Sequence, residues 1–286
     1  MKIRKAVICA AGWGTRFLPV TRSQPKEMLP LVDKPVIQYT VEEAINSGIE
    51  QIVLVTALGK RAIEDYFDRC FELEYFLKQR RETKLLKRMR ELSNLADICY
   101  IRQKEQLGLG HAILTASTVI GDEPFAVLLP DDIIESKTPA LKQMMKVYEQ
   151  HEGNIIAVEP ISLEDTVKYG VIKPEGISPR LYRVLGLVEK PKPTETPSNL
   201  GVVGRYILTP EIFDVIRVTP PGKNGEIQVT DALQLLLSKQ AMYAYEFDGI
   251  RYDVGTPIGW LKATVALAMK RPDIAPELRD YLRRLL

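Results

Sequence analysis

The fold that we expect follows from one stretch, Ala10-Ala11-Gly12-Trp13-Gly14-Thr15-Arg16-Phe17-Leu18-Pro19, continued by Pro25-Lys26-Glu27-Met28-Leu29-Pro30. The apolar residues 6–10 lead directly into it and predict a buried strand. The glycines let backbone N–H groups face an anion, and Arg16 and Lys26 offer further donors to phosphate oxygens. The stretch therefore predicts a loop that binds polyphosphate, although Gly12-Trp13-Gly14 alone would also fit an ordinary turn after a strand.

Two better-known phosphate loops do not occur in this sequence. The pattern G-x-x-x-x-G-K-[ST] is absent, and Gly59-Lys60-Arg61 lacks the Ser or Thr that would bind magnesium. The dinucleotide fingerprint needs a third glycine, and Phe17 stands in its place. These differences exclude a P-loop protein and argue against an NAD-dependent oxidoreductase.

Composition and charge are those of an ordinary globular protein. The 286 residues carry a formal net charge of +2, which gives no general attraction for nucleic acid or membrane, and no apolar run is long enough to span a bilayer. Three scattered cysteines and two histidines argue against disulfides, a zinc site and a Ser-His-Asp hydrolase. We therefore expect a cytoplasmic protein without a signal peptide and without nucleic-acid or membrane partners.

Strands and helices alternate up to about residue 160. Apolar periodicity and turn residues predict strands at 51–56, 97–103, 124–129 and 154–158, and helices at 35–47, 60–67, 108–119 and 138–150. Shorter strands follow at 169–172, 181–188, 200–207 and 241–247, with helices at 210–216, 230–238, 257–269 and 277–286. This order predicts an α/β fold with a Rossmann-like mixed, mainly parallel sheet flanked by helices and a smaller β-rich second half.

Residues 71–92 are rich in basic side chains and predict one long helix. Such a helix could be an interaction face for an acidic partner. The nearly neutral charge of the whole chain favours the other interpretation, a solvated surface helix whose inward face carries Leu73, Phe76, Leu77, Leu85 and Met89.

Further polar residues follow predicted strands, where open α/β sheets bind ligands. Asp131 and Asp253 carry the hard oxygen ligands that Mg²⁺ prefers, although each would also suit a turn. Glu189-Lys190 combines a carboxylate for sugar hydroxyls with an ammonium for a sugar phosphate, or it forms a surface turn. Gln103, with Gly108 after it, offers the amide donor and acceptor that the edge of a pyrimidine requires.

The pattern G-x-G-T-R-x-L-P, followed by P-K-E-M-L-P, resembles the signature of the sugar-phosphate nucleotidylyltransferases. The other motifs follow in that family's order to the C-terminus, so the resemblance covers essentially the whole chain. Gly108-Leu109-Gly110-His111-Ala112 resembles the uridylyltransferase branch rather than the thymidylyltransferase branch. Residues 21–24 and 56–59 depart from the family, and Gly201 stands where alanine is expected, close to the expected sugar pocket. None of these departures removes an expected ligand.

The resemblance implies a role for each candidate residue. Contacts to the uracil side are expected from Ala10, Ala11, Gly12, Glu27, Gln103 and Gly108. Contacts to the triphosphate are expected from Gly14, Thr15, Arg16 and Lys26. The glucose would be contacted by Gly170, Glu189, Val202 and Glu226, and its phosphate by Lys190. Asp131 and Asp253 would bind Mg²⁺, while Arg16, Lys26 and Lys190 would act in catalysis.

The resemblance also implies a reaction, in which the phosphate of glucose 1-phosphate attacks the α-phosphorus of UTP with the help of Mg²⁺. A phosphate monoester is already anionic near neutrality, because its second pKa is about 6, so no general base is expected. Residues 1–286 would form a single domain with a nucleotide-binding half, 1–160, and a sugar-phosphate-binding half, 161–286, that includes the C-terminal helices. UDP-glucose and pyrophosphate would be the products.

Two alternatives to this function stay open. The same chemistry could use another nucleotide, such as dTTP, or another sugar 1-phosphate. An inactive sugar-nucleotide sensor is less favoured, because all the charged residues that the reaction needs are present. We also expect a homo-oligomer, a dimer or tetramer, in which the amphipathic helix at 279–286 would dock on a partner subunit, although it could instead dock on its own domain.

Overall fold

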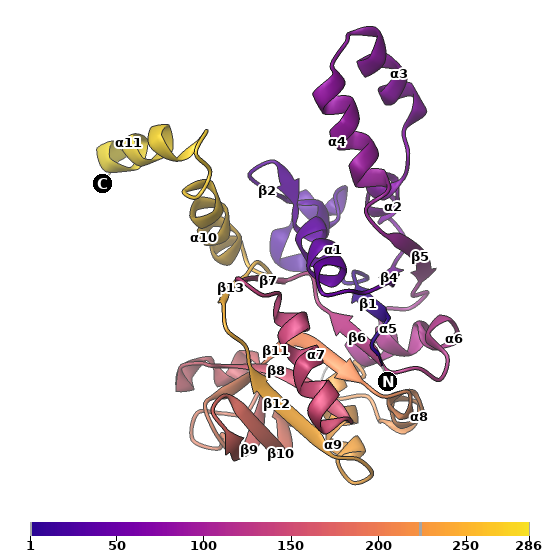
Figure 1. The fold of residues 1–286 in the computed structure, drawn as a ribbon. Coiled ribbons are helices and arrows are strands. Elements are labelled where there is room, and N and C mark those ends of the chain that lie inside the picture. The colour runs from indigo at the N-terminus through magenta and orange to yellow at the C-terminus, as the bar shows by residue number, and fades with distance from the viewer. Residues whose placement is uncertain (1, 223–224, 286) are drawn as a thin grey trace.

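A nine-stranded sheet lies at the centre of the fold (Figure 1). The computed structural model describes residues 2–222 and 225–285. Across the sheet the strands follow the order β5 (Asp97–Arg102), β4 (Gln51–Thr56), β1 (Lys5–Cys9), β6 (Phe125–Leu128), β11 (Leu200–Leu208), β8 (Asn154–Pro160), β12 (Met242–Glu246), β10 (Leu181–Glu189) and β9 (Gly170–Ser178). All the segments expected as strands therefore belong to one sheet.

The sheet is mixed, as the sequence predicts. β5, β4, β1 and β6 run parallel, and so do β8 and β12. β11 is antiparallel to β6, β8 and β9, and β10 is antiparallel to β9 and β12. β4 and β6 are buried on both faces, which explains their nearly unbroken apolar sequences. The parallel character thus belongs mainly to the first half of the chain.

Helices cover both faces of the sheet and enclose two apolar layers. Because side chains alternate along a strand, Ile8 and Leu128 point to one layer, and Val7 and Val127 point to the other. The first layer is completed by α1 (Val36–Asn46), α2 (Arg61–Phe67) and α7 (Ala140–His151). The second is completed by α5 (Leu109–Thr115), α6 (Ser117–Ile120), α8 (Glu211–Val218) and α9 (Val229–Leu236).

Short elements connect these layers where the parallel strands end. β7 (Asp132–Glu135) begins shortly after β6 and pairs with β13 (Ile250–Asp253), which places Asp253 opposite Asp132. The loop after β1 contains the short helices η1 (Thr15–Phe17), η2 (Val20–Arg22) and η3 (Lys26–Met28) and the pair β2 (Pro30–Leu31) and β3 (Lys34–Pro35), while η4 (Leu163–Lys168) precedes β9. Residues far apart in the sequence thereby meet at one edge of the sheet.

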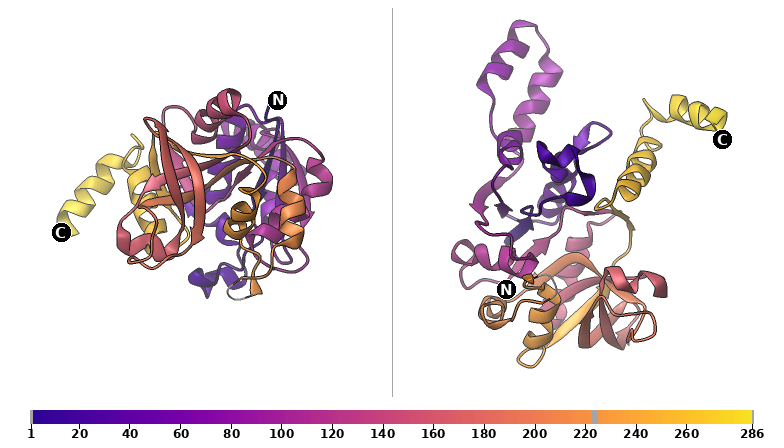
Figure 2. Two further views of the ribbon diagram at one scale, coloured as in Figure 1. Left: turned by 90° about the horizontal axis from the view of Figure 1, so that it is seen from below. Right: turned by 180° about the vertical axis from the view of Figure 1, so that it is seen from behind.

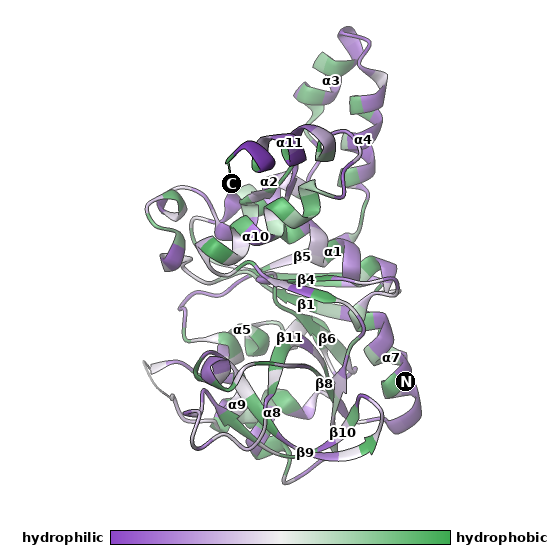
Figure 3. Ribbon diagram, turned by 90° about the vertical axis from the view of Figure 1, so that its left-hand side faces the viewer, coloured by the Kyte–Doolittle hydropathy of each residue, from purple (hydrophilic) through white to green (hydrophobic). Residues whose placement is uncertain are grey.

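The expectation of one long helix at 71–92 is wrong. Two helices, α3 (Phe71–Gln79) and α4 (Thr83–Ser93), form a hairpin that stands away from the sheet (Figures 1 and 3). Arg81 adopts a left-handed backbone (φ 59°) between them. Because each helix packs mainly on the other, Leu73, Phe76 and Leu85 remain exposed, and only Leu77 of the expected inward residues is buried.

The C-terminal helices form a second projection, on another side of the molecule (Figure 2). These are α10 (Pro257–Ala268) and α11 (Ala275–Leu285), and residue 286 of the expected terminal helix lies outside the described residues. Only Ala275 of α11 is buried, so this helix does not dock on its own domain. Every helix within the described ranges is too short or too polar to cross a bilayer.

Candidate functional site

Two cavities adjoin at the edge of the sheet where the first strands end. The glycine-loop pocket has a volume of about 510 Å³ and lies between the loop after β1, the turn after β6 and residues 103–112. The Lys190 pocket has a volume of about 600 Å³ and is lined from η4, β9, β10, β11, α9 and β13. Leu109, Leu129 and Asp131 line both cavities. Molecules bound in the two pockets would therefore meet at Asp131.

The glycine-loop pocket collects most of the residues expected to hold a nucleotide, namely Ala11, Gly12, Gly14, Thr15, Lys26, Glu27, Gln103 and Gly108. Ala10 differs, because its side chain is fully buried in the apolar layer beside Ile8. The side chain of Ala10 therefore cannot make the expected contact to the uracil side. Arg16 lines the Lys190 pocket instead, and its Nη1 donates weakly to the carbonyl of Gly255 at 3.4 Å.

Gln103 follows β5 and is only 3% exposed. Its Nε2 donates to the carbonyl oxygen of Gly108 at 3.2 Å and lies 2.9 Å from Nδ1 of His111. Because a carbonyl oxygen only accepts, this contact fixes which end of the amide is nitrogen. No donor among the described residues reaches Oε1 of Gln103, so the amide presents a hydrogen-bond acceptor to the pocket that it lines.

Gly108 occupies a position that accepts no other residue. Its φ is 95°, and an added Cβ would lie 2.8 Å from Cβ of Glu226 and 2.9 Å from the carbonyl oxygen of Ile227. The close approach arises because the N–H of Ile227 donates to the carbonyl of Leu107 at 2.7 Å, and the N–H of Gly110 donates to that of Ile227 at 2.9 Å. Glu226, expected at the glucose, thereby lies on the wall of the glycine-loop pocket.

Two lysines and two carboxylates form a charged cluster beside the glycine-rich loop. Nζ of Lys26 donates to both oxygens of Asp131, at 2.7 and 2.5 Å, and Nζ of Lys60 donates to both oxygens of the buried Glu27, at 2.9 and 2.7 Å. Burial lowers the pKa of Lys26, but Asp131 and Glu27 outweigh it and raise that pKa. Burial raises the pKa of Glu27, against the opposing charge of Lys60. The carboxylate of Glu27 is thus already paired.

The Lys190 pocket brings together Gly170, Glu189, Lys190 and Val202. Nζ of Lys190 lies 3.0 Å from Oε1 of Glu189, and its main-chain N–H donates to the carbonyl of Tyr169 at 3.1 Å. The backbone of Lys190 is left-handed, with φ 48°. Non-glycine residues adopt this conformation rarely, and they concentrate at functional sites. Together with the cavity that Lys190 lines, this backbone makes the corner a candidate for ligand binding.

Comparison with known proteins identifies the family. The sequence pattern described as nucleotidyl transferase matches residues 5–270. The chain belongs to this family. It is 52% identical over 284 residues, 99% of each chain, to the UTP–glucose-1-phosphate uridylyltransferase of Staphylococcus epidermidis.

Solved structures of similar proteins support the same family and confirm the expected fold class. A UDP-glucose pyrophosphorylase complexed with UDP-glucose has a TM-score of 0.86 and 46% identity, over 94% of this chain and 100% of that chain. A UTP-bound UGPase from Acinetobacter baumannii has a TM-score of 0.92 and 39% identity, over 99% and 100%. This nucleotidyl transferase therefore shares its fold with proteins whose structures contain a nucleotide or a nucleotide sugar.

Membership of the nucleotidyl transferase family suggests dependence on a divalent metal, and two carboxylates fit that need. A Cβ added at Gly255 would lie 3.1 Å from Oδ1 of Asp253 and 3.3 Å from Oδ2 of Asp131, so the two carboxylates converge at this point. Within residues 2–222 and 225–285, no group of three or more His, Cys, Asp or Glu is placed to hold a metal. A cation would therefore need these carboxylates together with oxygens of a bound substrate.

Two residues of this nucleotidyl transferase that the sequence did not predict for the site, Arg251 and Tyr169, hold carboxylates that line the Lys190 pocket. Nε of Arg251 donates to Oδ1 of Asp132 at 2.6 Å, and the guanidinium also contacts Glu159 and the ring of Tyr169. The hydroxyl of Tyr169 donates to Oδ2 of Asp253 at 3.2 Å. Burial lowers the pKa of Arg251, but Asp132 and Glu159 raise it above its ordinary value. The one signal in the sequence was an arginine close to Asp253.

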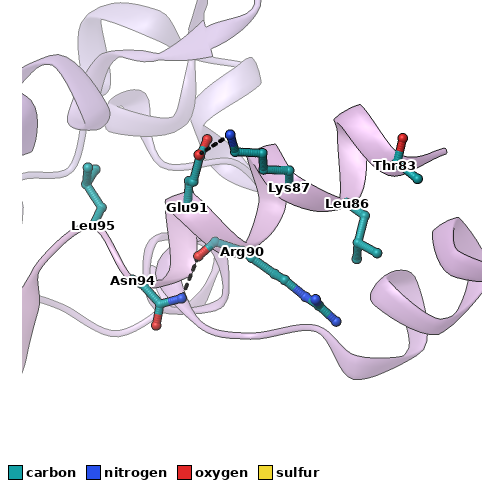
Figure 4. Close-up of a pocket in the computed structure, with 7 residues that line it drawn as sticks. All are labelled: Thr83, Leu86, Lys87, Arg90, Glu91, Asn94 and Leu95. Carbon is teal, nitrogen blue, oxygen red and sulfur yellow. Dashed lines mark hydrogen bonds and ion pairs between the residues drawn. The ribbon is translucent and has the colours of Figure 1, made fainter.

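A further hollow lies along α4, far from these strand ends (Figures 1 and 4). It is lined by Thr83, Leu86, Lys87, Arg90, Glu91, Asn94 and Leu95. The contacts drawn in Figure 4 are local to the helix: Lys87 pairs with Glu91 at 3.7 Å, and Nδ2 of Asn94 donates to the carbonyl of Arg90 at 2.7 Å. No expected site residue lies there, so we assign it no part in catalysis.

Proposed function

We propose that this protein transfers UMP from UTP to glucose 1-phosphate and releases pyrophosphate. The proposal rests on two cavities that meet at Asp131, one lined by Gln103 and Gly108 and the other by Glu189 and Lys190. The name of the Staphylococcus epidermidis relative, and the UTP and UDP-glucose in the similar structures, support it. The halves 1–160 and 161–286 would each supply most of the contacts to one substrate.

The base would be selected by Gln103. Its Oε1 presents an acceptor, which complements the N3–H donor of uracil. Cytosine has an acceptor at the same ring position and would leave two acceptors facing each other. Thymine presents the same N3–H as uracil, so this contact selects against cytosine and not against thymine.

The triphosphate would bind along the glycine-rich loop. Thr15 and Lys26 line the same pocket as Gln103, and Arg16 would reach the phosphates from the adjoining Lys190 pocket. We assign Asp131 and Asp253 to Mg²⁺, which when bound neutralises charge on phosphate oxygens. Lys26 pairs with Asp131 in this structure, so the cation would release its ammonium group to the phosphates.

The sugar phosphate would bind opposite. Glu189 would accept hydrogen bonds from glucose hydroxyls, Gly170 and Val202 would pack on the sugar, and Lys190 would pair with its phosphate. The left-handed backbone of Lys190 would aim the ammonium group at that phosphate. Glu226 lies on the other wall, so we propose that it contacts the nucleotide side rather than the glucose.

The reaction would then be one in-line displacement. An oxygen of the glucose 1-phosphate forms a bond to the α-phosphorus of UTP, the bond from that phosphorus to the bridging oxygen breaks, and pyrophosphate leaves. The nucleophile is already anionic, because its second pKa is about 6, so no general base is needed. The protein would act by holding two polyanions together: Arg16 and Lys26 would stabilise the charge that develops on the leaving pyrophosphate, and Lys190 would hold the incoming phosphate in place.

An assay of pyrophosphate release tests this proposal. The purified protein is incubated with Mg²⁺, glucose 1-phosphate and one of UTP, dTTP, CTP, ATP or GTP. We expect release to be fastest with UTP and slow with CTP. Preference for another nucleotide would indicate a transferase with the same chemistry and a different nucleotide substrate. If no nucleotide gives pyrophosphate, only the inactive sugar-nucleotide sensor is left.

We also propose that the protein acts in the cytoplasm as a homo-oligomer, a dimer or tetramer. Its three cysteines are free, which fits a reducing compartment. Tyr75 and Phe76 on α3 and Ile258 on α10 are large apolar side chains that remain exposed on the two projections. Light scattering after size exclusion should give a mass above that of one chain, and Phe76→Ser with Ile258→Ser should lower it. An unchanged monomer mass in the unsubstituted protein would contradict this.

A further inference from the structure

The turn from Leu129 to Asp132, which carries Asp131, is held by main-chain contacts on both sides. The N–H of Leu129 donates to the carbonyl of Gly204 at 2.9 Å, and the N–H of Gly204 donates to Oδ2 of Asp132 at 2.9 Å. The N–H of Val254 donates to the carbonyl of Asp131 at 2.8 Å. The turn therefore lies between β11 and β13, and its position depends on both.

One side chain completes this arrangement from inside the protein. Arg205 on β11 is fully buried, and its Nη1 donates to the carbonyl of Leu129 at 2.9 Å while its Nη2 donates to the carbonyl of Asp132 at 2.6 Å. A single guanidinium thus spans both ends of the turn that carries Asp131. Arg205 lines neither of the two pockets, so any effect on a substrate must pass through the turn.

The back of the same guanidinium is paired with Glu43 of α1. Nε of Arg205 donates to both carboxylate oxygens at 3.1 Å, and Nη2 donates to Oε2 at 2.8 Å. Glu43 also accepts the N–H of Leu141 at 3.1 Å, in the first turn of α7. The arginine therefore has fixed partners on every side.

The backbone of β11 is shaped to allow this. In the pairing of β11 with β8, Val203 lies opposite Ala157 and Tyr206 opposite Ile156, so Gly204 and Arg205 have no register partner there. Such a bulge changes the direction of a side chain. A Cβ at Gly204 would lie only 2.6 Å from both Oδ2 of Asp132 and Cβ of Leu129, so glycine alone permits the close contact with the turn.

Stability alone does not account for a buried ion pair at this place. Apolar side chains of similar volume commonly stabilise a core as well as a buried ion pair or better. A guanidinium differs from an apolar side chain because it donates to several acceptors in a rigid fork. It also differs from a lysine, whose donors all lie on one atom. The requirement here is to hold two main-chain carbonyls in one geometry.

We propose that Arg205 is a positioning residue that fixes the turn 129–132 and so presents the carboxylate of Asp131 to the metal bound with the nucleotide. The proposal rests on the function proposed above, since it assumes that Asp131 binds the metal. Groups that orient metal ligands without touching the metal typically change metal affinity or activity by about 10- to 100-fold when they are replaced.

The test compares metal binding in two variants. Arg205→Lys keeps the buried charge but cannot reach both carbonyls and Glu43 together. Arg205→Met combined with Glu43→Gln removes the charge and leaves an acceptor for the N–H of Leu141. The dissociation constant of Mn²⁺ from the protein–UTP complex is measured by electron paramagnetic resonance, and kcat and the KM for glucose 1-phosphate are measured at saturating metal. Phe213→Leu, in the apolar layer beside Phe125, is the control for general destabilisation.

We expect both Arg205 variants to bind Mn²⁺ about 10- to 100-fold more weakly and to lose kcat, with the KM for glucose 1-phosphate retained. Phe213→Leu should melt earlier with unchanged Mn²⁺ binding. Wild-type Mn²⁺ affinity in a folded Arg205 variant would overturn the proposal, and so would failure of both variants to fold, which would assign Arg205 to stability. If the unsubstituted protein releases no pyrophosphate, the proposed function fails, but Mn²⁺ binding with UTP still tests Arg205.

Discussion

Glu43 and Glu74 both accept hydrogen bonds from arginine and are both largely buried, but their arginine partners differ in exposure. Glu43, on α1, pairs with Arg205, whose side chain has no exposed area. Glu74, on α3, pairs with Arg69 and Arg90, whose side chains are 45% and 52% exposed. The shortest contact is 2.8 Å in each cluster, so geometry alone does not separate them.

Burial of the arginine, rather than hydrogen-bond length, therefore decides what each charged pair can do. Removing one partner of a buried pair leaves an uncompensated charge that water cannot reach. Water screens the arginines of the hairpin and would solvate them if Glu74 were lost. The buried pair can therefore fix the turn beside the two pockets, whereas the hairpin pair only ties two projecting helices together.

The largest effect should come from breaking the buried pair. We expect Glu43→Ala to lower the free energy of unfolding by about 3–5 kcal/mol, because Arg205 stays buried without its carboxylate. Glu74→Ala is the matched control, and its loss should be much smaller. Urea unfolding followed by circular dichroism measures both, and equal losses would show that burial does not distinguish the two clusters.

The next largest effect is expected on the reaction rate rather than on stability. Asp131→Asn and Lys190→Ala should each raise the activation free energy by ~3 kcal/mol, which lowers kcat roughly a hundredfold. The melting temperature should change little. Lys192→Ala is the control, since Lys192 is exposed and pairs with Glu195 at 3.4 Å. Near-normal turnover in either site variant would remove that residue from the proposed mechanism.

Much of the fold could be predicted from the sequence because apolar runs report burial directly. Residues 51–56 and 200–207 are rich in apolar side chains, and they form strands β4 and β11 as expected. The carboxyl end of a predicted strand also located Asp131 and Gln103, since ligands bind where such strands end. The sharing of Asp131 by two pockets then follows from topology.

Other features depend on contacts between distant segments, which periodicity does not report. The sequence of residues 71–92 shows an apolar face. It does not show that the segment forms two helices that pack mainly against each other. Arg205 is one charged residue in an apolar strand, which signals a buried partner of opposite charge. The sequence does not show which residue that partner is, because Glu43 lies far away in the chain, on α1. The place of Glu226 depends on the pairing of Ile227 with residues 107–110.

A smaller effect is expected at Gln103, which is buried but carries no charge. Gln103→Leu removes one neutral hydrogen-bond acceptor from the glycine-loop pocket, so kcat/KM for UTP should fall about 3- to 10-fold. The value for CTP should not fall, because the substitution removes an acceptor that opposes the N3 acceptor of cytosine. Competing the two nucleotides in one reaction measures the ratio, and an unchanged ratio would contradict the assignment of Gln103 to the base.

The smallest effect concerns the charge of Glu74 itself. Hydrogen bonds from Arg69 and Arg90 lower the pKa of this carboxyl from 4.5 to about 2. A lowered pKa in the folded state means that its stabilisation is complete above the ordinary value and is lost as the pH falls from about 4.5 towards 2. Glu74→Gln should therefore lower hydrogen-exchange protection of the hairpin amides at neutral pH, and the difference from the unsubstituted protein should shrink below about pH 4.5.

Activity should not change in Glu74→Gln, because the hairpin contributes no residue to either pocket. A protection difference that stays constant as the pH falls would mean that the arginines do not use the charge of Glu74. The contrast with Glu43 would then rest on packing rather than on solvation of charge, and the large loss expected of Glu43→Ala would need the same explanation.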